Sequence, residues 1–215
     1  MNNLYNSNNI LSLKRLDDAF YRRENVVKIA RELIGKILVT NFNDDITAVR
    51  ITETEAYNGI IDRASHAYNG RRTARTEIMY AGGGVAYIYL CYGIHHLFNV
   101  VTNEKDIPHA VLIRAGEPLC GIEKIMERSN KKTFAATIAA GPGNLSRALG
   151  IHTKNTGEYL SGNKIFIADD GYKISSHNII ASPRIGVAYA KEDALLPYRF
   201  YIKNSVYVSG SKHQL

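Results

Sequence analysis

Closely spaced β-type segments restrict the fold of this chain more than any other feature. Residues 36–42 (KILVTNF) and 46–57 (ITAVRITETEAY) are rich in β-branched residues, and only the short stretch NDD separates them. A second pair of such segments lies on either side of Tyr92-Gly93, within residues 85–102. Connections this short join antiparallel strands, because a parallel crossover needs about a dozen residues or more. The sequence therefore predicts a mainly antiparallel sheet with a hairpin whose tip lies near Tyr92.

The rest of the chain adds helices and further strands to this sheet. Helices are expected at 24–36 (ENVVKIARELIGK), after Pro118 (PLCGIEKIMERSNKK) and at 144–151 (NLSRALGI). Strands are expected at 109–118 (HAVLIRAGEP), 163–170 (NKIFIADD), 184–190 (RIGVAYA) and 198–204 (YRFYIKN). No repeat or linker divides the chain. We expect a mixed α/β (α+β) fold with a flexible Asn-rich tail at residues 1–15 and a single domain at 16–210, in which helices flank the sheet and the hairpin protrudes.

Arginine is concentrated in the long connection at residues 58–84. The whole chain carries a net charge of +7, which favours a polyanionic partner. Guanidinium groups bind phosphate through a planar fork of donors. Phosphate contacts are therefore one interpretation of this connection, and a solvated loop is the other. The candidates for phosphate contact are Arg63, Arg71, Arg72 and Arg75.

Several classes of protein are not expected. No apolar run reaches the roughly 18 residues of a membrane-spanning helix, and the N-terminal sequence lacks an apolar signal core, so we expect a cytoplasmic protein without membrane contact. Cys91 and Cys120 have no metal-ligand spacing, and His95-His96 would face opposite sides of a strand. The run Gly82-Gly83-Gly84 is not followed by the residues of a phosphate-binding loop. We expect neither a metal nor a cofactor.

Two glutamates in the segment TETEAY are the first candidates for chemistry. Glu53 and Glu55 fall on one face of the predicted strand, and Tyr57 follows on the same face. A carboxylate held in a pocket is suited to act as a general base, whereas a solvent-facing edge would leave both glutamates without a catalytic role. Arg114 ends an apolar strand and is expected to pair with a carboxylate. It could orient Glu55 or form a purely structural ion pair.

Aromatic residues of the predicted hairpin are the second group of candidates. Tyr87 and Tyr89 alternate with aliphatic residues and face one side, while Tyr92 stands at the tip. An exposed aromatic at a tip suggests a partner, and aromatic side chains enter nucleic acid by stacking or wedging. The alternative is that Tyr92 folds back onto the sheet. His66 is a lone histidine, and from its sequence context alone we expect a surface or capping residue.

Six separated blocks of the sequence match a known family. They are TETEAY, SHAYNGRRTARTEIMY, GGGVAYIYLCYGIHHLFNVVT, HAVLIRAGEPL, AAGPGNLSRALGI and PRIGVAYA, in this order. The chain resembles the alkyladenine (3-methyladenine) DNA glycosylases over roughly residues 17–208, and it looks like a bacterial-type member. The resemblance implies a single mixed α/β domain with an antiparallel sheet and a protruding hairpin. It also implies base-excision repair, in which a damaged purine is flipped from DNA and its N-glycosidic bond is hydrolysed.

The resemblance implies catalytic roles for residues of the matching blocks. Glu55 is implied to be the general base that activates water, and Arg114 is implied to help hold that water. The backbone carbonyl of Ile185 is implied to be a further water contact. No lysine stands in the matching pocket blocks, so we expect no Schiff-base intermediate and no cleavage of the strand.

The resemblance likewise implies how the flipped base is held. Tyr57 is implied to lie on one face of the base, with His66 and Tyr89 on the other. Asn99 is implied to lie against the purine edge and to help exclude guanine, and Tyr92 is implied to intercalate into DNA.

The expected partner is double-stranded DNA that contains damaged purines, bound by a monomer. Alkylated purines such as 3-methyladenine carry a positive charge and leave easily, and tyrosine rings attract such cations. Whether 7-methylguanine, hypoxanthine or ethenoadenine are accepted is left open by the sequence. Two other classes compete: a nucleic-acid-binding module without catalysis, which has no need of a buried carboxylate, and a nuclease, which would need acidic metal ligands.

Overall fold

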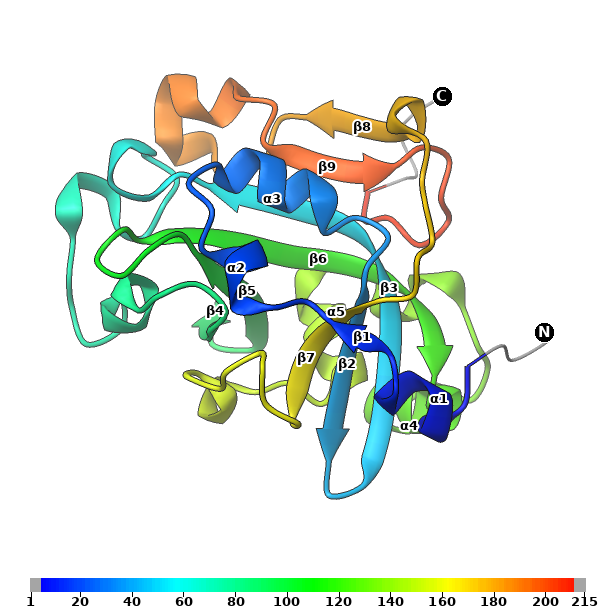
Figure 1. Cartoon of the computed structure of the whole chain (residues 1–215). Helices are drawn as coiled ribbons and strands as arrows, with labels where there is room; N and C mark the ends of the chain where they lie inside the picture. Colours follow the sequence, from blue (N-terminus) through cyan, green and yellow to red (C-terminus); the bar gives the residue numbers. More distant parts are fainter. Residues whose placement is uncertain (1–4, 211–215) are drawn as a thin grey trace.

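One nine-stranded sheet organises residues 5–210, the part of the chain that this computed structural model describes (Figure 1). The main strand order is β1-β7-β2-β3-β6-β5-β4, and β9 pairs with both β3 and β8. All strand pairs are antiparallel, so the predicted fold class is confirmed. The strands are β1 (Lys14–Arg15), β2 (Ile37–Phe42), β3 (Asp45–Tyr57), β4 (Ala86–Cys91), β5 (His95–Thr102), β6 (His109–Cys120), β7 (Ile165–Asp169), β8 (Ile179–Ser182) and β9 (Arg199–Ile202).

The central strand β3 changes its neighbour halfway along its length. Its first half pairs with β2 across a tight turn in which Asn43 and Asp44 have φ of 54° and 65°. Its second half pairs on that side with β9, from Glu53 to Glu55. Strand β6 covers the other side of β3, and the register between β3 and β6 shifts around Glu53. Bulges of this kind redirect side chains, and this one lies where Glu53 and Glu55 are buried.

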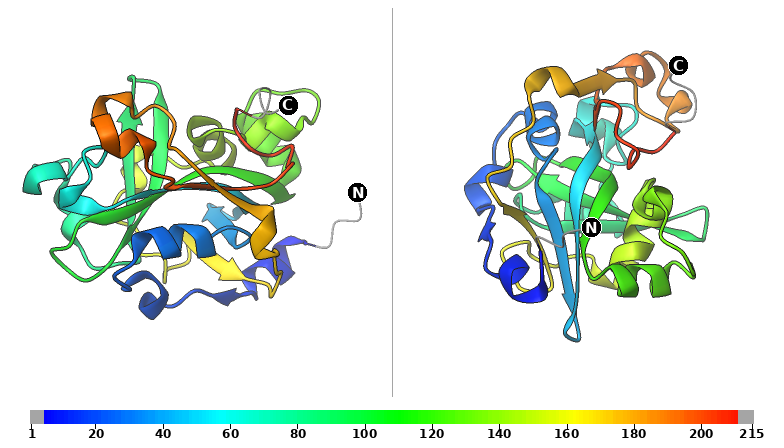
Figure 2. Two further views of the ribbon diagram at one scale, coloured as in Figure 1. Left: turned by 90° about the horizontal axis from the view of Figure 1, so that it is seen from above. Right: turned by 90° about the vertical axis from the view of Figure 1, so that its right-hand side faces the viewer.

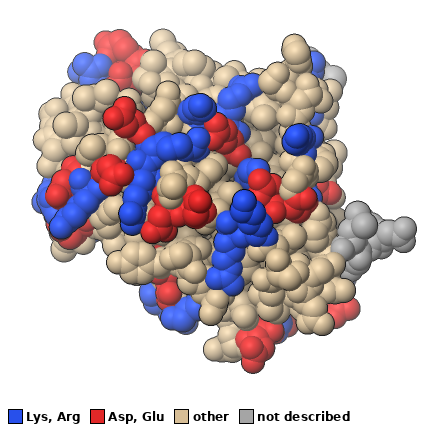
Figure 3. All heavy atoms as spheres, in the orientation of Figure 1, with Lys and Arg blue, Asp and Glu red and all other residues tan. Residues whose placement is uncertain are grey.

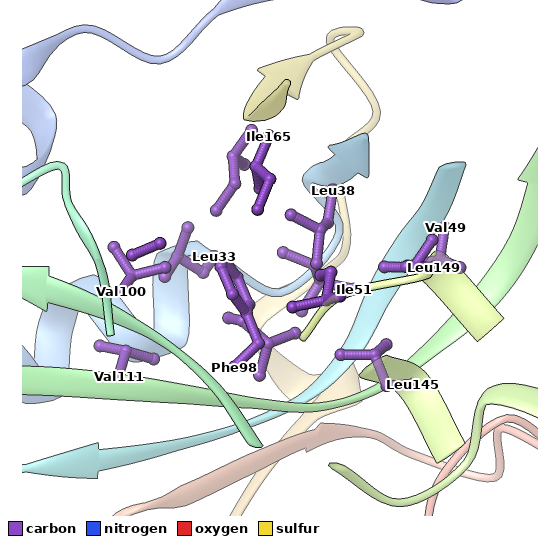
Figure 4. Packing of buried hydrophobic residues seen from close by; sticks show 14 of the residues in the cluster. Leu33, Leu38, Val49, Ile51, Phe98, Val100, Val111, Leu145, Leu149 and Ile165 are labelled. Atoms are coloured by element: carbon purple, nitrogen blue, oxygen red, sulfur yellow. The ribbon is translucent and has the colours of Figure 1, made fainter. Parts of the chain in front are cut away.

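Short helices cover the sheet and complete the hydrophobic core. They are α1 (Ser7–Leu11), α2 (Asp18–Tyr21), α3 (Val26–Glu32), α4 (Ile122–Arg128) and α5 (Pro142–Leu149), and single 3₁₀ turns fill much of the long connection at 58–84. Figure 4 shows Leu33, next to α3, and Leu145 and Leu149 of α5 among buried side chains of the sheet such as Ile51 and Phe98. Full burial of each such side chain stabilises the fold by about 1.5–3 kcal/mol.

Three local predictions are wrong. From residue 5 onward, the N-terminal segment is ordered and is not a flexible tail. Its helix α1 has a capping box, Ile10 is fully buried, and β1 pairs with β7. Residues 1–4 lie outside the described part of the chain. The segment 184–190 is a bend that leads into a 3₁₀ helix (Ala188–Leu195), not a strand. The helix after Pro118 begins only at Ile122, because β6 continues through Pro118 to Cys120.

The hairpin of β4 and β5 projects from the body of the molecule, as Figure 2 shows in green. The face that carries α2 and α3 shows basic and acidic side chains interleaved, without a continuous basic track (Figure 3). None of the helices in residues 5–210 is both long and apolar enough to cross a membrane.

Candidate active site

A cavity of about 610 Å³ opens beside the base of the hairpin. Its volume lies within the range that small-molecule sites occupy. Its wall includes the N-terminal end of α5 and the segment that leads into the last 3₁₀ helix. The site residues predicted from the sequence that line it are Tyr57, His66, Arg75, Tyr89, Tyr92, Asn99, Arg114 and Ile185. The fold therefore brings together most of the predicted site.

Strand register explains how one face of the sheet becomes the floor of this cavity. Tyr57 is opposite Ala110, Asn99 is opposite both Leu112 and Tyr87, and all of these residues line the cavity. Successive side chains of a strand point to opposite faces. The residues between them therefore enter the core on the other face, as Ala56, Val100 and Val111 do. In β4, Tyr87 and Tyr89 face the cavity and Ile88 between them enters the core, whereas Leu90 near the tip is exposed and lines the cavity too.

Glu53 is fully buried in a network that the sequence did not reveal. Its Oε1 accepts hydrogen bonds from Nε of Arg114 at 2.8 Å, from Nε of Arg199 at 2.7 Å and from Oγ of Ser209 at 2.8 Å. Its Oε2 accepts from the backbone N–H of Ser209 at 2.8 Å. Burial by itself would raise the pKa of Glu53, but Arg114 and Arg199 outweigh it and hold this pKa below its usual range. Glu53 thus stays ionised and fixes Arg114.

Glu55 is also fully buried, and its carboxylate lies just beneath the cavity lining. Its Oε1 accepts a hydrogen bond from the backbone N–H of Ile185 at 2.7 Å. Its Oε2 accepts from the hydroxyl of Tyr57 at 2.9 Å and lies 3.3 Å from Nη1 of Arg114. A solvent-facing position for this pair of glutamates is therefore wrong. All three partners of Glu55, which are Tyr57, Arg114 and Ile185, line the cavity.

Tyr57 acts as a hydrogen-bond donor in this arrangement. Burial, followed by the charge of Glu55, raises the pKa of Tyr57 well above its ordinary value. The phenol therefore keeps its proton and stabilises the carboxylate of Glu55. For Ile185, the structure places the N–H against Glu55, whereas the expected role of its carbonyl toward a water stays a prediction.

The pair of Asp62 and Arg184 ties three segments of the cavity wall together. The guanidinium of Arg184 donates to both oxygens of Asp62 at 2.5 and 2.8 Å, and its side chain is completely buried. It also donates to the backbone carbonyls of Ala56 at 2.9 Å and Asp193 at 3.0 Å, and it lies 4.9 Å from the ring centroid of Tyr57. Because Ala56 follows Glu55 directly, this pair fixes the carboxylate and its donor Ile185 together. Neither Asp62 nor Arg184 stands out in the sequence, and both are apparent only from the tertiary contacts.

His66, Tyr87 and Tyr89 form an aromatic wall of the cavity. Nδ1 of His66 lies 2.7 Å from the hydroxyl of Tyr87, and its ring packs edge-on against Tyr89 at 4.6 Å. Burial, with added repulsion from Arg75 and Arg71, lowers the pKa of His66 to about 4. This histidine is therefore neutral at pH 7. Tyr57 approaches the cavity from β3, a different strand from the β4 tyrosines.

Asn99 is buried beneath the same wall, and its amide nitrogen is fully used. Its Nδ2 donates to the backbone carbonyls of Tyr87 and Leu97, each at 3.1 Å. The side-chain oxygen is therefore the part of Asn99 that remains to meet a molecule in the cavity. The expected contact with a purine edge stays a prediction.

Tyr92 occupies the hairpin tip in an unfavourable backbone conformation. Its φ is 50° and that of Gly93 is 72°, which is the geometry of a tight turn that favours Asn, Asp or Gly at its first position. Such conformations in a bulky residue cost of the order of 1–3 kcal/mol. The side chain is 89% exposed, so it does not fold back onto the sheet. Neither the backbone nor the core explains a tyrosine here, and its expected intercalation into DNA stays a prediction.

The four predicted phosphate-binding arginines lie in different electrostatic surroundings. Arg63 forms an ion pair with Glu192, and Arg72 forms ion pairs with Glu77 and Asp106. Within residues 5–210, neither Arg71 nor Arg75 has a carboxylate within ion-pair distance. Phosphate contact by these residues stays a prediction, and the structure favours Arg71 and Arg75 over the two paired arginines.

No group of three or more His, Cys, Asp or Glu side chains in the described part of the chain could hold a metal ion. His96 instead packs against His152 at 4.8 Å and accepts a hydrogen bond from the backbone N–H of Thr153.

One family model and several curated proteins are similar to this chain over most of its length. The family model described as methylpurine-DNA glycosylase matches residues 19–206. A curated protein of Desulfitobacterium hafniense is 43% identical over 204 residues, which cover 92% of this chain and 99% of that protein. Proteins of Natranaerobius thermophilus and Clostridium perfringens are each 42% identical and cover 91% of this chain and 98% of their own lengths. The names of all three designate them as candidate 3-methyladenine DNA glycosylases.

Proposed function

The chain belongs to the methylpurine-DNA glycosylase family, and from this premise we propose that it flips an alkylated purine out of double-stranded DNA into the cavity and hydrolyses its N-glycosidic bond. A glycosylase acts on a base that has left the duplex, at a cost of a few kcal/mol for unstacking and unpairing. In this proposal Tyr92 lowers the cost of flipping, the tyrosine-lined cavity binds the flipped base, and Glu55 activates the water that attacks the sugar.

The observation that carries the proposal is the setting of Glu55. A buried carboxylate is costly unless it is paired and hydrogen-bonded, and a protein that only bound DNA would have no use for one beneath its cavity. Here the carboxylate of Glu55 is held by Ile185, Tyr57 and Arg114, which all face the cavity. This setting fits a general base beside a reacting centre.

In the proposed reaction a water molecule takes the place beside Glu55. Glu55 accepts a proton from this water, the water oxygen forms a bond to C1′ of the deoxyribose, and the bond from C1′ to the base nitrogen breaks. The bonding electron pair leaves with the base. A base that is positively charged from alkylation becomes neutral as it accepts this pair. Until Glu55 accepts the proton, the negative charge of its carboxylate near C1′ stabilises the oxocarbenium character of the sugar.

Arg114 has a supporting part in this scheme. Its charge is shared between Glu53 and Glu55, so it can orient Glu55 without cancelling its charge. Glu53 is bonded to two arginines and to Ser209, so it is not available as the base. The two glutamates of TETEAY therefore have different proposed roles: Glu53 positions Arg114, and Glu55 reacts.

We propose a monofunctional enzyme that leaves the DNA strand intact. Cleavage of the strand by a glycosylase requires an amine nucleophile that forms a Schiff base with the sugar. The described residues that line the cavity include arginine and histidine but no lysine. We also propose that the enzyme acts as a monomer.

The decisive experiment is release of free base from methylated duplex DNA in the presence of a chelator. We expect 3-methyladenine to be released, the abasic strand to stay intact until alkali is added, and the chelator to have no effect. Strand breaks that the chelator suppresses would indicate a metal-dependent nuclease. Binding without any release of base would indicate a nucleic-acid-binding module.

Tyr92→Ala is expected to impair removal of a base from matched duplex DNA more than removal of the same base from a bulge. The exposed ring would fill the gap left by the flipped nucleotide and slow its return. Its loss should lower the flipped population by about the energy of one stacking contact, 1–3 kcal/mol, or roughly ten- to a hundredfold. Single-turnover base release on the two substrates measures this effect. An equal loss on both substrates would mean that Tyr92 supports the hairpin instead of wedging into DNA.

A further inference from the structure

Arg75 stands at the cavity wall with an unpaired positive charge. Its guanidinium carbon lies 5.0 Å from the ring centroid of Tyr89, and the residue is exposed and lines the cavity. Within residues 5–210, it has no carboxylate within ion-pair distance. Arg72, on the same loop, differs in both respects: it pairs with Glu77 and Asp106, and it is not among the residues that line the cavity.

The other arginines that line the cavity or lie against Tyr57 are compensated. Arg71 also lacks a carboxylate within ion-pair distance among residues 5–210, but it does not line the cavity. Arg114 shares its charge with Glu53 and Glu55. Arg184, which lies against Tyr57, is paired with Asp62. His66 is neutral at pH 7, because burial and then the charges of Arg75 and Arg71 lower its pKa to about 4. The charge of Arg75 therefore acts on the aromatic wall without a nearby carboxylate to cancel it.

The position of Arg75 over Tyr89 affects the binding of a cationic base, because a tyrosine ring attracts any cation placed over it. A purine with a positive charge from alkylation would be drawn to Tyr89 by the same attraction that holds Arg75. Two positive charges at this distance repel each other, and the repulsion is strong where water is partly excluded. A neutral damaged purine gains less from the tyrosines and suffers no such repulsion.

Resting on the proposed function, we propose that Arg75 is a specificity-determining residue that weakens the preference of the cavity for cationic purines and so admits neutral ones. Arg75 occupies the cation position over Tyr89 when no base is bound. Its charge repels a cationic base, and this repulsion offsets part of the attraction between that base and the tyrosine rings.

The test compares the binding of a cationic and a neutral base without catalysis. In a Glu55→Gln background, affinity is measured for duplexes that carry one 7-methylguanine, which is cationic, or one hypoxanthine, which is neutral. Adding Arg75→Gln should raise the affinity ratio of 7-methylguanine to hypoxanthine roughly tenfold at low salt. The gain should shrink between about 50 and 200 mM salt, because salt screens charges at an exposed rim.

Two variants separate the charge of Arg75 from its shape and from the net charge of the loop. Arg75→Lys keeps the charge and should leave the ratio within about twofold of the background value. Arg72→Gln removes an equal charge from the same loop but outside the cavity, and it should also leave the ratio within about twofold. An unchanged ratio with Arg75→Gln, or an equal rise with Arg75→Lys, would overturn the inference.

Base release by the unmodified protein tests the proposed function separately from the role of Arg75. If it releases no base from methylated duplex DNA, the proposed function fails. If it releases base but Arg75→Gln leaves the affinity ratio unchanged, only the role of Arg75 fails.

Discussion

Glu55→Gln should reduce the rate of base release by about 100- to 10,000-fold. Its affinity for lesion-containing DNA should stay close to that of the unmodified protein. Glutamine has nearly the same shape, so its oxygen can still accept the N–H of Ile185. It cannot take a proton from water, and it removes the negative charge that stabilises the sugar cation. Single-turnover release of 3-methyladenine and equilibrium binding to the same duplex measure the two effects separately.

Glu192→Gln is a matched control for this substitution. Glu192 lies in the 3₁₀ helix next to the cavity wall, where it pairs with Arg63, but it does not line the cavity. We expect base release within about twofold of the unmodified protein, because an exposed ion pair contributes little. Release by Glu55→Gln within about tenfold of the unmodified rate would rule out Glu55 as the general base.

Asp62→Asn should lower the free energy of unfolding by about 3–5 kcal/mol, since it leaves the buried charge of Arg184 uncompensated. The carboxylate of Asp62 accepts hydrogen bonds from the backbone N–H groups of Asn58 and Ala64 as well as from Arg184. An amide would place an N–H group against these donors. Base release by the folded fraction should also fall, because the pair of Asp62 and Arg184 holds Ile185 against Glu55. A displacement of about 1 Å in an active site can cost roughly a hundredfold in rate. Denaturant unfolding and single-turnover release measure the two losses.

Asp170→Asn is the matched control, because the chain contains a second buried arginine–aspartate pair. Arg50 donates to both oxygens of Asp170, at 3.2 and 2.7 Å, and Asp170 does not line the cavity. This variant should lose stability but keep the rate of base release per folded molecule. If the two variants lost base release equally, the pair of Asp62 and Arg184 would have only a structural role.

Local sequence patterns predicted much of the fold correctly. The hairpins around residues 43–45 and at Tyr92 follow from short connections between β-rich segments, and the helix of α3 follows from apolar spacing and Gly35. In each of these cases the determining interactions lie within a few residues of one another. Identification of Glu55, Tyr57 and Tyr89 as residues of one site rested on the resemblance, and the strand register shows why they meet.

Predictions failed where distant contacts override local preference. RIGVAYA has the composition of a strand, but Arg184 is drawn into a buried pair with Asp62 and the segment bends. The N-terminal residues are rich in asparagine, yet Ile10 fits into a cluster that includes Ile37 and Phe166. The packing partners in both cases are more than 20 residues away along the chain.

The sequence by itself determined the antiparallel character of the sheet, the place of Tyr92 at a turn and the family of the chain. These properties depend on turn length, side-chain alternation and ordered blocks of residues, which are all visible along the chain. The resemblance implied that Glu55 is the general base, but only the tertiary structure decided how differently the two glutamates are surrounded. Glu53 and Glu55 are chemically identical and share one strand face, but Arg199 and Ser209 enclose Glu53 whereas Tyr57 and Ile185 connect Glu55 to the cavity. The role of a carboxylate depends on the donors around it, and folding brings those donors from distant parts of the chain.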